Sequence, residues 1–200
     1  MTTTAVRRQF SFRWRKDDGT ETTATWWATE NTNPATAAMP LNANIRIRFE
    51  IGETAGGTGS IGAQLQYQIN GGTWTNVNAS SLYVRSSASA NFADGDTVTN
   101  QLTTANAIVA TFSGSRMDEV DGLITSISYS SSHGEPEHCI QLRSADFVAG
   151  DVLALRETNA GTVFDIYTNT PSYIPVAGSA AGRPIFHRDV RQAIQRASFY

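Results

Sequence analysis

The segment from residue 133 to residue 139 holds the densest group of potential metal ligands in the chain. It runs His-Gly-Glu-Pro-Glu-His-Cys, and imidazole, carboxylate and thiol groups all bind zinc. The spacing matches no structural zinc motif, and Pro136 stiffens its middle. If residues 138–143 form a strand, the side chains of His138 and Cys139 point to opposite faces and do not reach one ion. We therefore expect an acidic loop that enters a strand, with no metal and no cofactor.

Two acidic turns offer hard oxygen ligands for calcium. They lie at residues 94–96, Asp-Gly-Asp, and at residues 118–122, Asp-Glu-Val-Asp-Gly. Neither follows the twelve-residue calcium loop, so solvated turns are the simpler interpretation. The motif Phe-x-x-Gly-Asp occurs at residues 92–96 and again at 147–151. We interpret it as one turn chemistry used twice, in which Gly takes the conformation that the turn needs and Asp accepts local backbone hydrogen bonds.

The remaining reactive residue types form no recognisable catalytic set. No serine lies in a nucleophile elbow, and no pair of acids is singled out for hydrolysis. We therefore expect that the protein is not an enzyme. Trp26, Trp27 and Trp74 raise the alternative of sugar stacking, although packing in the core or in an interface accounts for them more simply.

Alternation of polar and apolar residues is the main structural signal of the chain. In residues 64–69 the apolar side chains share one face and the glutamines the other, which we expect to be wet, and Asn70-Gly71 fits a type I′ hairpin turn. In residues 44–51 the apolar side chains again share one face, so Arg46 and Arg48 are expected on the solvent side or in an interface.

These patterns predict nine to ten strands in an all-β fold, including a buried strand over residues 107–112. Their spacing is typical of an antiparallel β-sandwich of the jelly-roll or immunoglobulin-like type. We predict an N-terminal arm at residues 1–7, the β-sandwich domain at residues 8–170, and a Pro/Gly-rich arm at residues 171–200. That arm ends in one short amphipathic helix, which must dock either on its own sandwich or on a neighbouring subunit.

The net charge of −3 hides a segregation along the chain. Both ends are basic, whereas residues 17–182 hold six arginines and seventeen acids. Such asymmetry indicates a contact with an acidic partner or with a neighbouring copy, unless the basic ends simply lie on their own acidic body. The candidate interaction residues are Arg7, Arg8, Arg13, Arg15, Arg183, Phe186, Arg188, Val190, Arg191, Ile194 and Arg196. A nucleic-acid partner is disfavoured, because the basic residues are few and lack interleaved stacking aromatics.

The only cysteine, Cys139, excludes a disulfide within the chain and leaves pairing between chains open. The N-terminus lacks the apolar region of a signal peptide, and no stretch is apolar enough to span a membrane. We therefore expect synthesis in the cytoplasm and no membrane partner.

Several sequence blocks carry a resemblance to a known class. They are residues 12–21 (FRWRKDDGTE) with 31–33 (NTN), 66–74 (QYQINGGTW), and 135–142 (EPEHCIQL) followed by 150–152 (GDV). Together they resemble β-sandwich structural proteins encoded in the morphogenesis regions of tailed phages and prophages. The resemblance covers residues 8–170 and leaves out the segment from Pro171. It implies a virion component, such as a head decoration protein or a tail or collar module, with no catalytic residues to transfer.

The expected function is thus that of a non-enzymatic structural component of a phage particle, foremost capsid decoration or stabilisation. The basic terminal segments would anchor it in the virion to capsid or tail subunits and to copies of itself. The alternative is an adhesion module associated with a tail, collar or fibre that binds host glycans.

Overall fold

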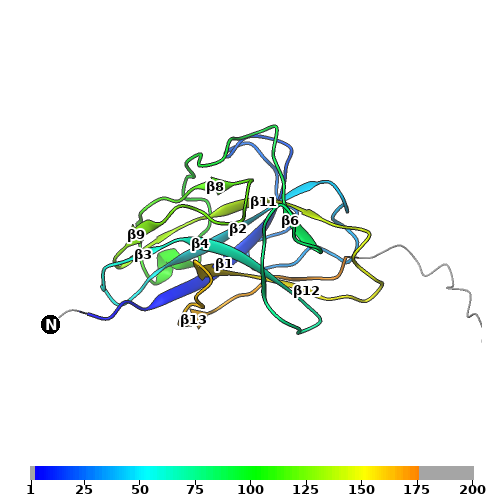
Figure 1. The fold of residues 1–200 in the computed structure, drawn as a ribbon. Coiled ribbons are helices and arrows are strands. Elements are labelled where there is room, and N and C mark those ends of the chain that lie inside the picture. The colour runs from blue at the N-terminus through cyan, green and yellow to red at the C-terminus, as the bar shows by residue number, and fades with distance from the viewer. Residues whose placement is uncertain (1–2, 176–200) are drawn as a thin grey trace, which may run out of the picture.

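The computed structural model describes residues 3–175 of the chain (Figure 1). This part contains one short 3₁₀ helix, η1 (Ala105–Ala107), and fourteen strands. The strands are β1 (Arg7–Lys16), β2 (Asn44–Glu53), β3 (Gly59–Ile61), β4 (Ala63–Ile69), β5 (Thr75–Asn76), β6 (Val84–Ser86), β7 (Thr111–Phe112), β8 (Met117–Asp118), β9 (Ile127–Tyr129), β10 (Ser132–Gly134), β11 (Glu137–Leu142), β12 (Leu153–Asn159), β13 (Ile166–Tyr167) and β14 (Ser172–Tyr173).

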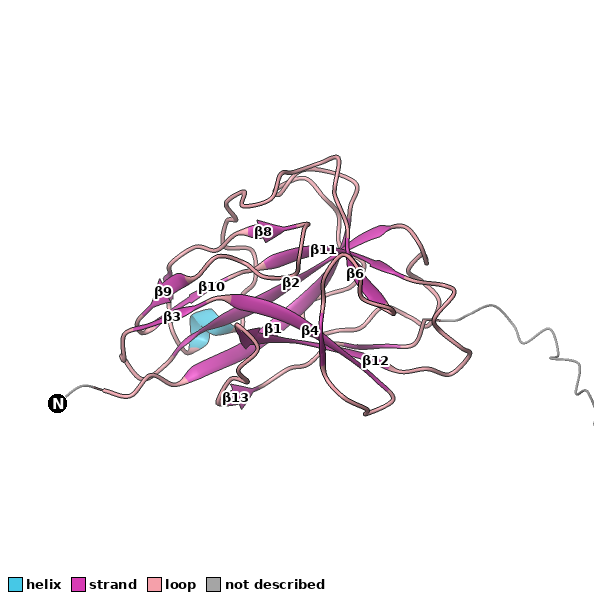
Figure 2. Cartoon of the chain, in the orientation of Figure 1, coloured by secondary structure: helices cyan, strands magenta, loops and turns pink. Residues whose placement is uncertain are grey.

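The strands form two main sheets and a small ribbon (Figure 2). The large sheet has eight strands, with the path β13-β1-β2-β10-β7 and with β11 pairing β2, β6 and β8. The small sheet has the order β14-β12-β4-β5, and β3 pairs β9 in the ribbon. Most pairs are antiparallel, and three short ones are parallel: β1 with β13, β10 with β7, and β11 with β8. The predicted all-β class is confirmed, whereas the predicted strand number is too low because many strands have only two or three residues.

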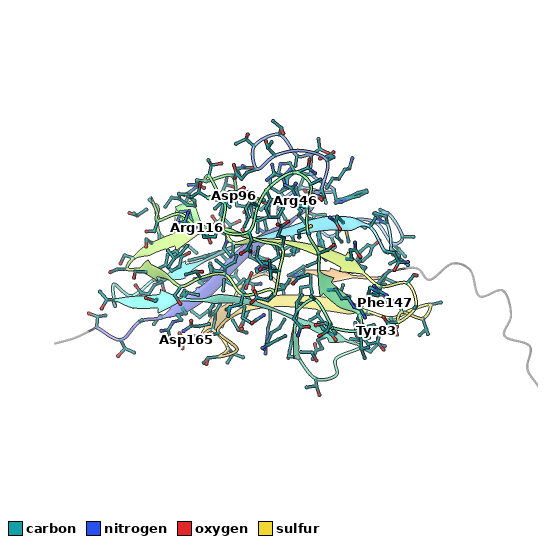
Figure 3. The ribbon with its side chains drawn as sticks, turned by 45° about the horizontal axis from the view of Figure 1, so that its top comes forward. Arg46, Tyr83, Asp96, Arg116, Phe147 and Asp165 are labelled. Atoms are coloured by element: carbon teal, nitrogen blue, oxygen red, sulfur yellow. The ribbon has the colours of Figure 1, made fainter. Side chains whose placement is uncertain are left out.

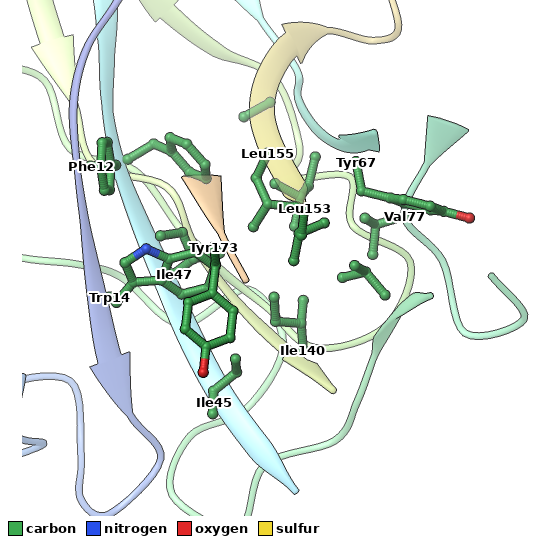
Figure 4. Packing of buried hydrophobic residues seen from close by; sticks show 14 of the residues in the cluster. Phe12, Trp14, Ile45, Ile47, Tyr67, Val77, Ile140, Leu153, Leu155 and Tyr173 are labelled. Atoms are coloured by element: carbon green, nitrogen blue, oxygen red, sulfur yellow. The ribbon is translucent and has the colours of Figure 1, made fainter. Parts of the chain in front are cut away.

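The main core lies between the two sheets (Figure 4). Trp14 and Ile47 come from the large sheet, and Leu65, Leu153 and Tyr173 come from the small one; each is at most 2% exposed. Period-two alternation explains this core, because it places every second side chain of β1, β2, β4 and β12 on the same inner face. Since Tyr173 packs on Trp14 with ring centroids 6.0 Å apart, the body extends into β14, beyond the predicted domain end at residue 170.

The turn after β4 is of the predicted type. Asn70 and Gly71 have φ angles of 51° and 71°, and the N–H of Gly72 donates to the carbonyl of Ile69 at 2.9 Å. Two successive residues with positive φ closed by this hydrogen bond define a type I′ turn.

The glutamine face of β4 is not the wet face that the alternation predicts. Gln64 and Gln66 are each 7% exposed. The side-chain amide of Gln64 donates to the carbonyls of Val77 and Gly122, and the guanidinium of Arg156 donates to Gln66 Oε1. Loops and one arginine therefore cover this face of the small sheet.

The two Phe-x-x-Gly-Asp motifs form the same turn, as the sequence predicts. Gly95 and Gly150 have φ angles of 81° and 90°. In each turn the carboxylate, of Asp96 or Asp151, accepts a hydrogen bond at 2.8 Å from the backbone N–H three residues earlier.

The prediction of a buried strand over residues 107–112 is wrong. This stretch begins in the 3₁₀ helix η1, Ile108 is 45% exposed, and only residues 111–112 join a sheet. The backbone N–H of Ala105 donates to the buried Glu50 side chain at 2.8 Å, which fixes η1 over the outer face of the large sheet. The predicted C-terminal helix lies outside the described residues. Among residues 3–175, no helix is long and apolar enough to cross a membrane.

Candidate functional site: ionic clusters inside the fold

The outer face of the large sheet, turned away from the main core, carries a buried layer of charged side chains. Arg15 faces Arg46 across β1 and β2, and Arg48 faces Glu137 across β2 and β11. Directly opposed residues of neighbouring strands point to the same face, so the three strands gather their charges there. We name Arg15, Arg46, Arg48, Glu135 and Glu137 the ionic layer; each is at most 1% exposed.

Glu137 is the centre of the ionic layer. Its Oε2 accepts from Arg15 Nη1 at 3.1 Å and from Arg48 Nε, and its Oε1 accepts from Arg46 Nη1 at 3.4 Å. Arg48 also donates to Glu135 at 2.9 Å and to Glu21 at 2.7 Å. Burial alone would lower the pKa of Arg48, but Glu137 and Glu135 outweigh it and raise that pKa, so the guanidinium stays charged.

Two polar loops, one containing Trp26 and the other Thr99, close over the ionic layer. The ring centre of Trp26 lies 4.5 Å from the guanidinium carbon of Arg15, and the carbonyl of Thr99 accepts from Arg48 at 3.1 Å. Arg46, labelled in Figure 3, is held by Asp17 and by the carbonyl of Gly19. The prediction that Arg46 and Arg48 lie on the solvent side or in an interface is therefore wrong for the isolated chain, because loops of the same chain cover that face.

Carboxylates also hold the backbone of the covering loop at residues 99–105. This loop has no regular structure before η1, and its amide groups bond to acids instead of to a strand. The carboxylates of Glu21, Glu30, Glu50 and Glu135 accept from the backbone N–H groups of Thr99, Gln101, Leu102, Thr103, Thr104 and Ala105. These acids, of which Glu50 and Glu135 are buried, thus position the loop that covers the ionic layer.

A second group adjoins the ionic layer at Glu50. One ligand atom from each of Glu50, His133 and Glu135 lies within 4.8 Å of the other two, and we name these residues the His133 cluster. Glu50 Oε2 accepts from Ser11 Oγ at 2.7 Å and from the N–H of Ala105 at 2.8 Å, whereas its Oε1 has no hydrogen-bond partner. Burial raises the pKa of Glu50 to about 7.

His133 is completely buried on β10, and burial lowers its pKa. Its Nδ1 lies 2.9 Å from the carbonyl of Val109, and because a carbonyl only accepts, Nδ1 carries the proton. In the neutral ring Nε2 then has a free lone pair. It has no hydrogen-bond partner and lies 3.8 Å from Glu50 Oε1.

A third group lies on the inner side of the large sheet, within the main core. His138 Nδ1 is 3.1 Å from Asp118 Oδ2, and its Nε2 is 2.7 Å from Glu157 Oε1. We name these three residues the histidine triad. Burial opposes a charge on His138, but Glu157 and Asp118 raise its pKa to about 10, so the ring is an imidazolium at neutral pH. Since Glu157 belongs to β12 and His138 to β11, the triad is an ionic link between the two sheets.

The histidine triad lacks the free ring nitrogen that a catalytic base of acyl transfer needs. Both ring nitrogens of His138 are bonded to carboxylates, and in residues 3–175 no hydroxyl or thiol group bonds to either nitrogen. A catalytic base needs one free nitrogen directed at the group whose proton it removes.

The predicted interaction residues have different locations. Arg15 belongs to the ionic layer and is 1% exposed, so its guanidinium does not reach the surface of the isolated chain. Arg7, Arg8 and Arg13 are half-buried on β1. Arg183, Phe186, Arg188, Val190, Arg191, Ile194 and Arg196 lie outside the described residues.

The segment of potential ligands at residues 133–139 is divided by the sheet. His138 faces Ile47 on the core side and Cys139 faces Arg46 on the outer side, which confirms that the two side chains point to opposite faces of the sheet. The residue that sequence reasoning missed is Glu50, far away in the chain. The signal was present, since Glu50 continues the alternation of Arg46 and Arg48 on β2.

The acidic turns use their carboxylates internally. Asp118 bonds to His138 and accepts from the N–H of Gly122 at 3.0 Å, and Asp96 closes its own turn. More broadly, seven of the seventeen acids between residues 17 and 182 are buried. The surface of the body is therefore less acidic than the sequence suggests.

Cys139 should be inert in the folded protein. Its side chain is 0% exposed, and burial raises the pKa of its thiol, so neither the access nor the thiolate needed for exchange is present. We expect no reaction with Ellman's reagent in buffer and one thiol per chain in denaturant. A disulfide-linked dimer on a non-reducing gel of folded protein would contradict this.

The three groups have in common that solvent does not reach them: the ionic layer, the His133 cluster and the histidine triad all consist of buried side chains. Their geometry holds the fold together and offers no open catalytic site within the described residues. Comparison of the chain with protein-family models, with curated proteins and with solved structures finds no match.

Proposed function

We propose that the chain is a non-enzymatic structural component of a phage particle, foremost a capsid decoration protein. Its basic terminal segments anchor it to the shell or to neighbouring copies. The phage setting comes from the resemblance of the sequence blocks between residues 8 and 170. The two facing sheets fit the antiparallel sandwich of that class, and a jelly-roll or immunoglobulin-like connectivity is part of this proposal.

The observation that supports a structural role best is the internal use of reactive groups. In residues 3–175, the close contacts of His133 and His138 with carboxylates lie inside the fold. A hollow of about 510 Å³ on the surface is instead lined by hydroxyl side chains, glycine and one tyrosine. The described part of the chain thus presents polar surface to other molecules, whereas these histidines and carboxylates are buried. This combination suits a binding role better than a catalytic one.

The anchoring role of the C-terminal segment is tested by ending the chain at Pro175. Residues 171–175 stay, because β14 pairs with β12 and Tyr173 is part of the core. We expect the full chain to sediment with particles of the encoding phage that were assembled without it, and the truncated chain to stay in the supernatant. Both chains should give the same urea unfolding curve.

Two outcomes would contradict parts of this proposal. Normal incorporation of the truncated chain would exclude anchoring by the C-terminal segment. Absence of the full chain from particles, in the lysate as well as after mixing, would exclude the particle function itself.

The glycan-binding alternative has one observation in its favour. The hollow of about 510 Å³ presents hydroxyl groups that suit a sugar, among them those of Ser60 and Ser128. The tryptophans favour it less, since Arg13 lies 4.3 Å from the ring centre of Trp26 and Arg156 lies 4.1 Å from that of Trp74. Binding on a glycan array that Ser128→Tyr abolishes would support this alternative, and a blank array would exclude it.

A further inference from the structure

We propose that the His133 cluster is a buried site for one divalent zinc-class cation, with His133 Nε2, Glu50 Oε1 and a Glu135 oxygen as ligands. The site would stabilise the fold, and the inference does not depend on the phage setting. Imidazole and carboxylate are both ordinary zinc ligands, and this set contains one of the first and two of the second. An all-oxygen set would instead favour calcium or magnesium.

Two unpartnered atoms point to a ligand. Glu50 Oε1 and His133 Nε2 are both buried, and neither has a hydrogen-bond partner. Each is a lone-pair atom when Glu50 is ionised and His133 is neutral, so they cannot bond to each other in that state. Buried polar atoms are normally satisfied, and buried charges are normally paired or bound to a metal.

The spacing fits a single ion. Glu50 Oε1 and His133 Nε2 are 3.8 Å apart. Two ligands about 2.0–2.2 Å from a tetrahedral zinc ion are about 3.3–3.6 Å apart, so a small rotation of the Glu50 carboxylate closes the difference. Because the ring proton is on Nδ1 and bonded to the carbonyl of Val109, Nε2 is already oriented as a ligand.

To bind the ion, Glu135 has to give up only the longer arm of one shared hydrogen bond. Its Oε1 accepts from the N–H groups of Gln101 and Leu102, each at 2.8 Å, and its Oε2 accepts from Arg48 at 2.9 Å. The Gln101 N–H also reaches Oε2 at 3.1 Å, as the longer arm of a shared bond. Giving up that longer arm frees a lone pair on Oε2 while Gln101 stays bonded to Oε1.

Charge balance also favours a cation. Glu50 and Glu135 are buried side by side, and Arg48 bonds to Glu135 while no cationic side chain in residues 3–175 bonds to Glu50. A divalent ion would balance Glu50 without a further side chain. The covering segment with Ala105 and Val109 makes the site inaccessible from outside, so we expect loading during folding.

The test uses the untagged full chain, stripped with chelator and refolded with one equivalent of Zn²⁺ or of Mg²⁺. The chain has three histidines, so their ring ¹⁵N signals can be assigned individually. We expect Zn²⁺ to shift the Nε2 signal of His133 and to raise the melting temperature, and Mg²⁺ to do neither. His138 should not respond, because both its nitrogens are bonded to carboxylates.

Variants separate this site from other ways of binding zinc. Glu50→Gln should weaken zinc binding at least tenfold, whereas Glu119→Gln, a half-buried acid that bonds to the backbone of Ser89, should leave it unchanged. The proposal is overturned if Zn²⁺ leaves His133 unaffected, as it would with a trapped water or a protonated Glu50, or if only His187 responds. If Glu50→Gln does not fold, the wild-type spectrum decides.

Discussion

Replacing Arg48 with methionine should lower the free energy of unfolding by about 3–5 kcal/mol, because it leaves buried carboxylates without their cation. Arg48 bonds to Glu137, Glu135 and Glu21, and the first two of these acids are completely buried. Methionine fills much of the same volume, so the loss is mainly electrostatic. Urea unfolding at pH 7 measures it, provided that the slope with urea concentration is unchanged.

Arg13→Met is the matched control for this change. Arg13 faces Arg48 across β1 and β2, yet it is half-buried, stacks on Trp26 and donates to the carbonyl of Ala28. Its replacement should cost less than about 1 kcal/mol, as is usual for partly exposed charges. Equal costs for the two variants would show that water reaches the ionic layer in solution.

A lysine at position 48 should not be able to take over the role of Arg48. One ammonium group is a point charge with no planar fork, so it cannot serve Glu137, Glu135 and Glu21 at once. We expect Arg48→Lys to recover less than half of the free energy of unfolding that Arg48→Met loses. Because the ion pairs are buried, the loss in the methionine variant should change little between low and high salt. If the methionine variant does not fold, the lysine variant gives the measurement.

The strands with regular alternation could be predicted because their periodicity is local. Residues 44–51, 64–69 and 138–143 all fall in strands, apart from one residue at the end of the last, and Asn70-Gly71 forms the expected turn. A period of two shows which side chains share a face. It does not show what covers the polar face, so Arg46 and Arg48 had the same pattern as exposed arginines.

The candidate sites depend on contacts that no local pattern contains. Glu50 meets His133 only because β10 pairs with β2 in the register that puts His133 opposite Gly52. The loop at residues 99–105 covers these residues by donating its amides to their carboxylates, and its own sequence has neither period two nor helical spacing. The same reasoning explains residues 107–112. Ala107 ends a 3₁₀ helix that the bond from Ala105 to Glu50 fixes, and only residues 111–112 form a strand.

The wild-type protein should lose stability as the pH rises from 7 to 9, by up to about 1.4 kcal/mol per pH unit. The cause is His138, whose pKa is about 10 in the folded protein and about 6.5 in an unfolded chain. A raised folded-state pKa stabilises fully below the unfolded value, and this contribution is lost as the pH rises through the folded value. His138→Leu should remove most of this slope.

Other buried groups act mainly outside this window. His138 and backbone hydrogen bonds lower the pKa of Asp118 in spite of burial, so its contribution is lost only as the pH falls below about 4. Burial raises the pKa of Cys139 and of Tyr129, whose stabilising contributions are lost above about pH 9 and 10. Burial also raises the pKa of Glu157, which titrates together with His138 as one unit. Burial raises the pKa of Glu50 to about 7, so Glu50 adds to the loss of stability near pH 7, and measurements between pH 8 and 9 report mainly the histidine triad.

At pH 7, His138→Leu should cost about 3–5 kcal/mol, because Asp118 and Glu157 then lie in the core without a cation between them. Adding Asp118→Asn and Glu157→Gln to the same chain should restore a large part of the loss, since it removes both unpaired charges. If His138→Leu does not fold, an NMR titration of the wild-type ring gives the same information. A pKa near 6.5 for His138 would show that the triad is not an ion pair and would remove the basis of this prediction.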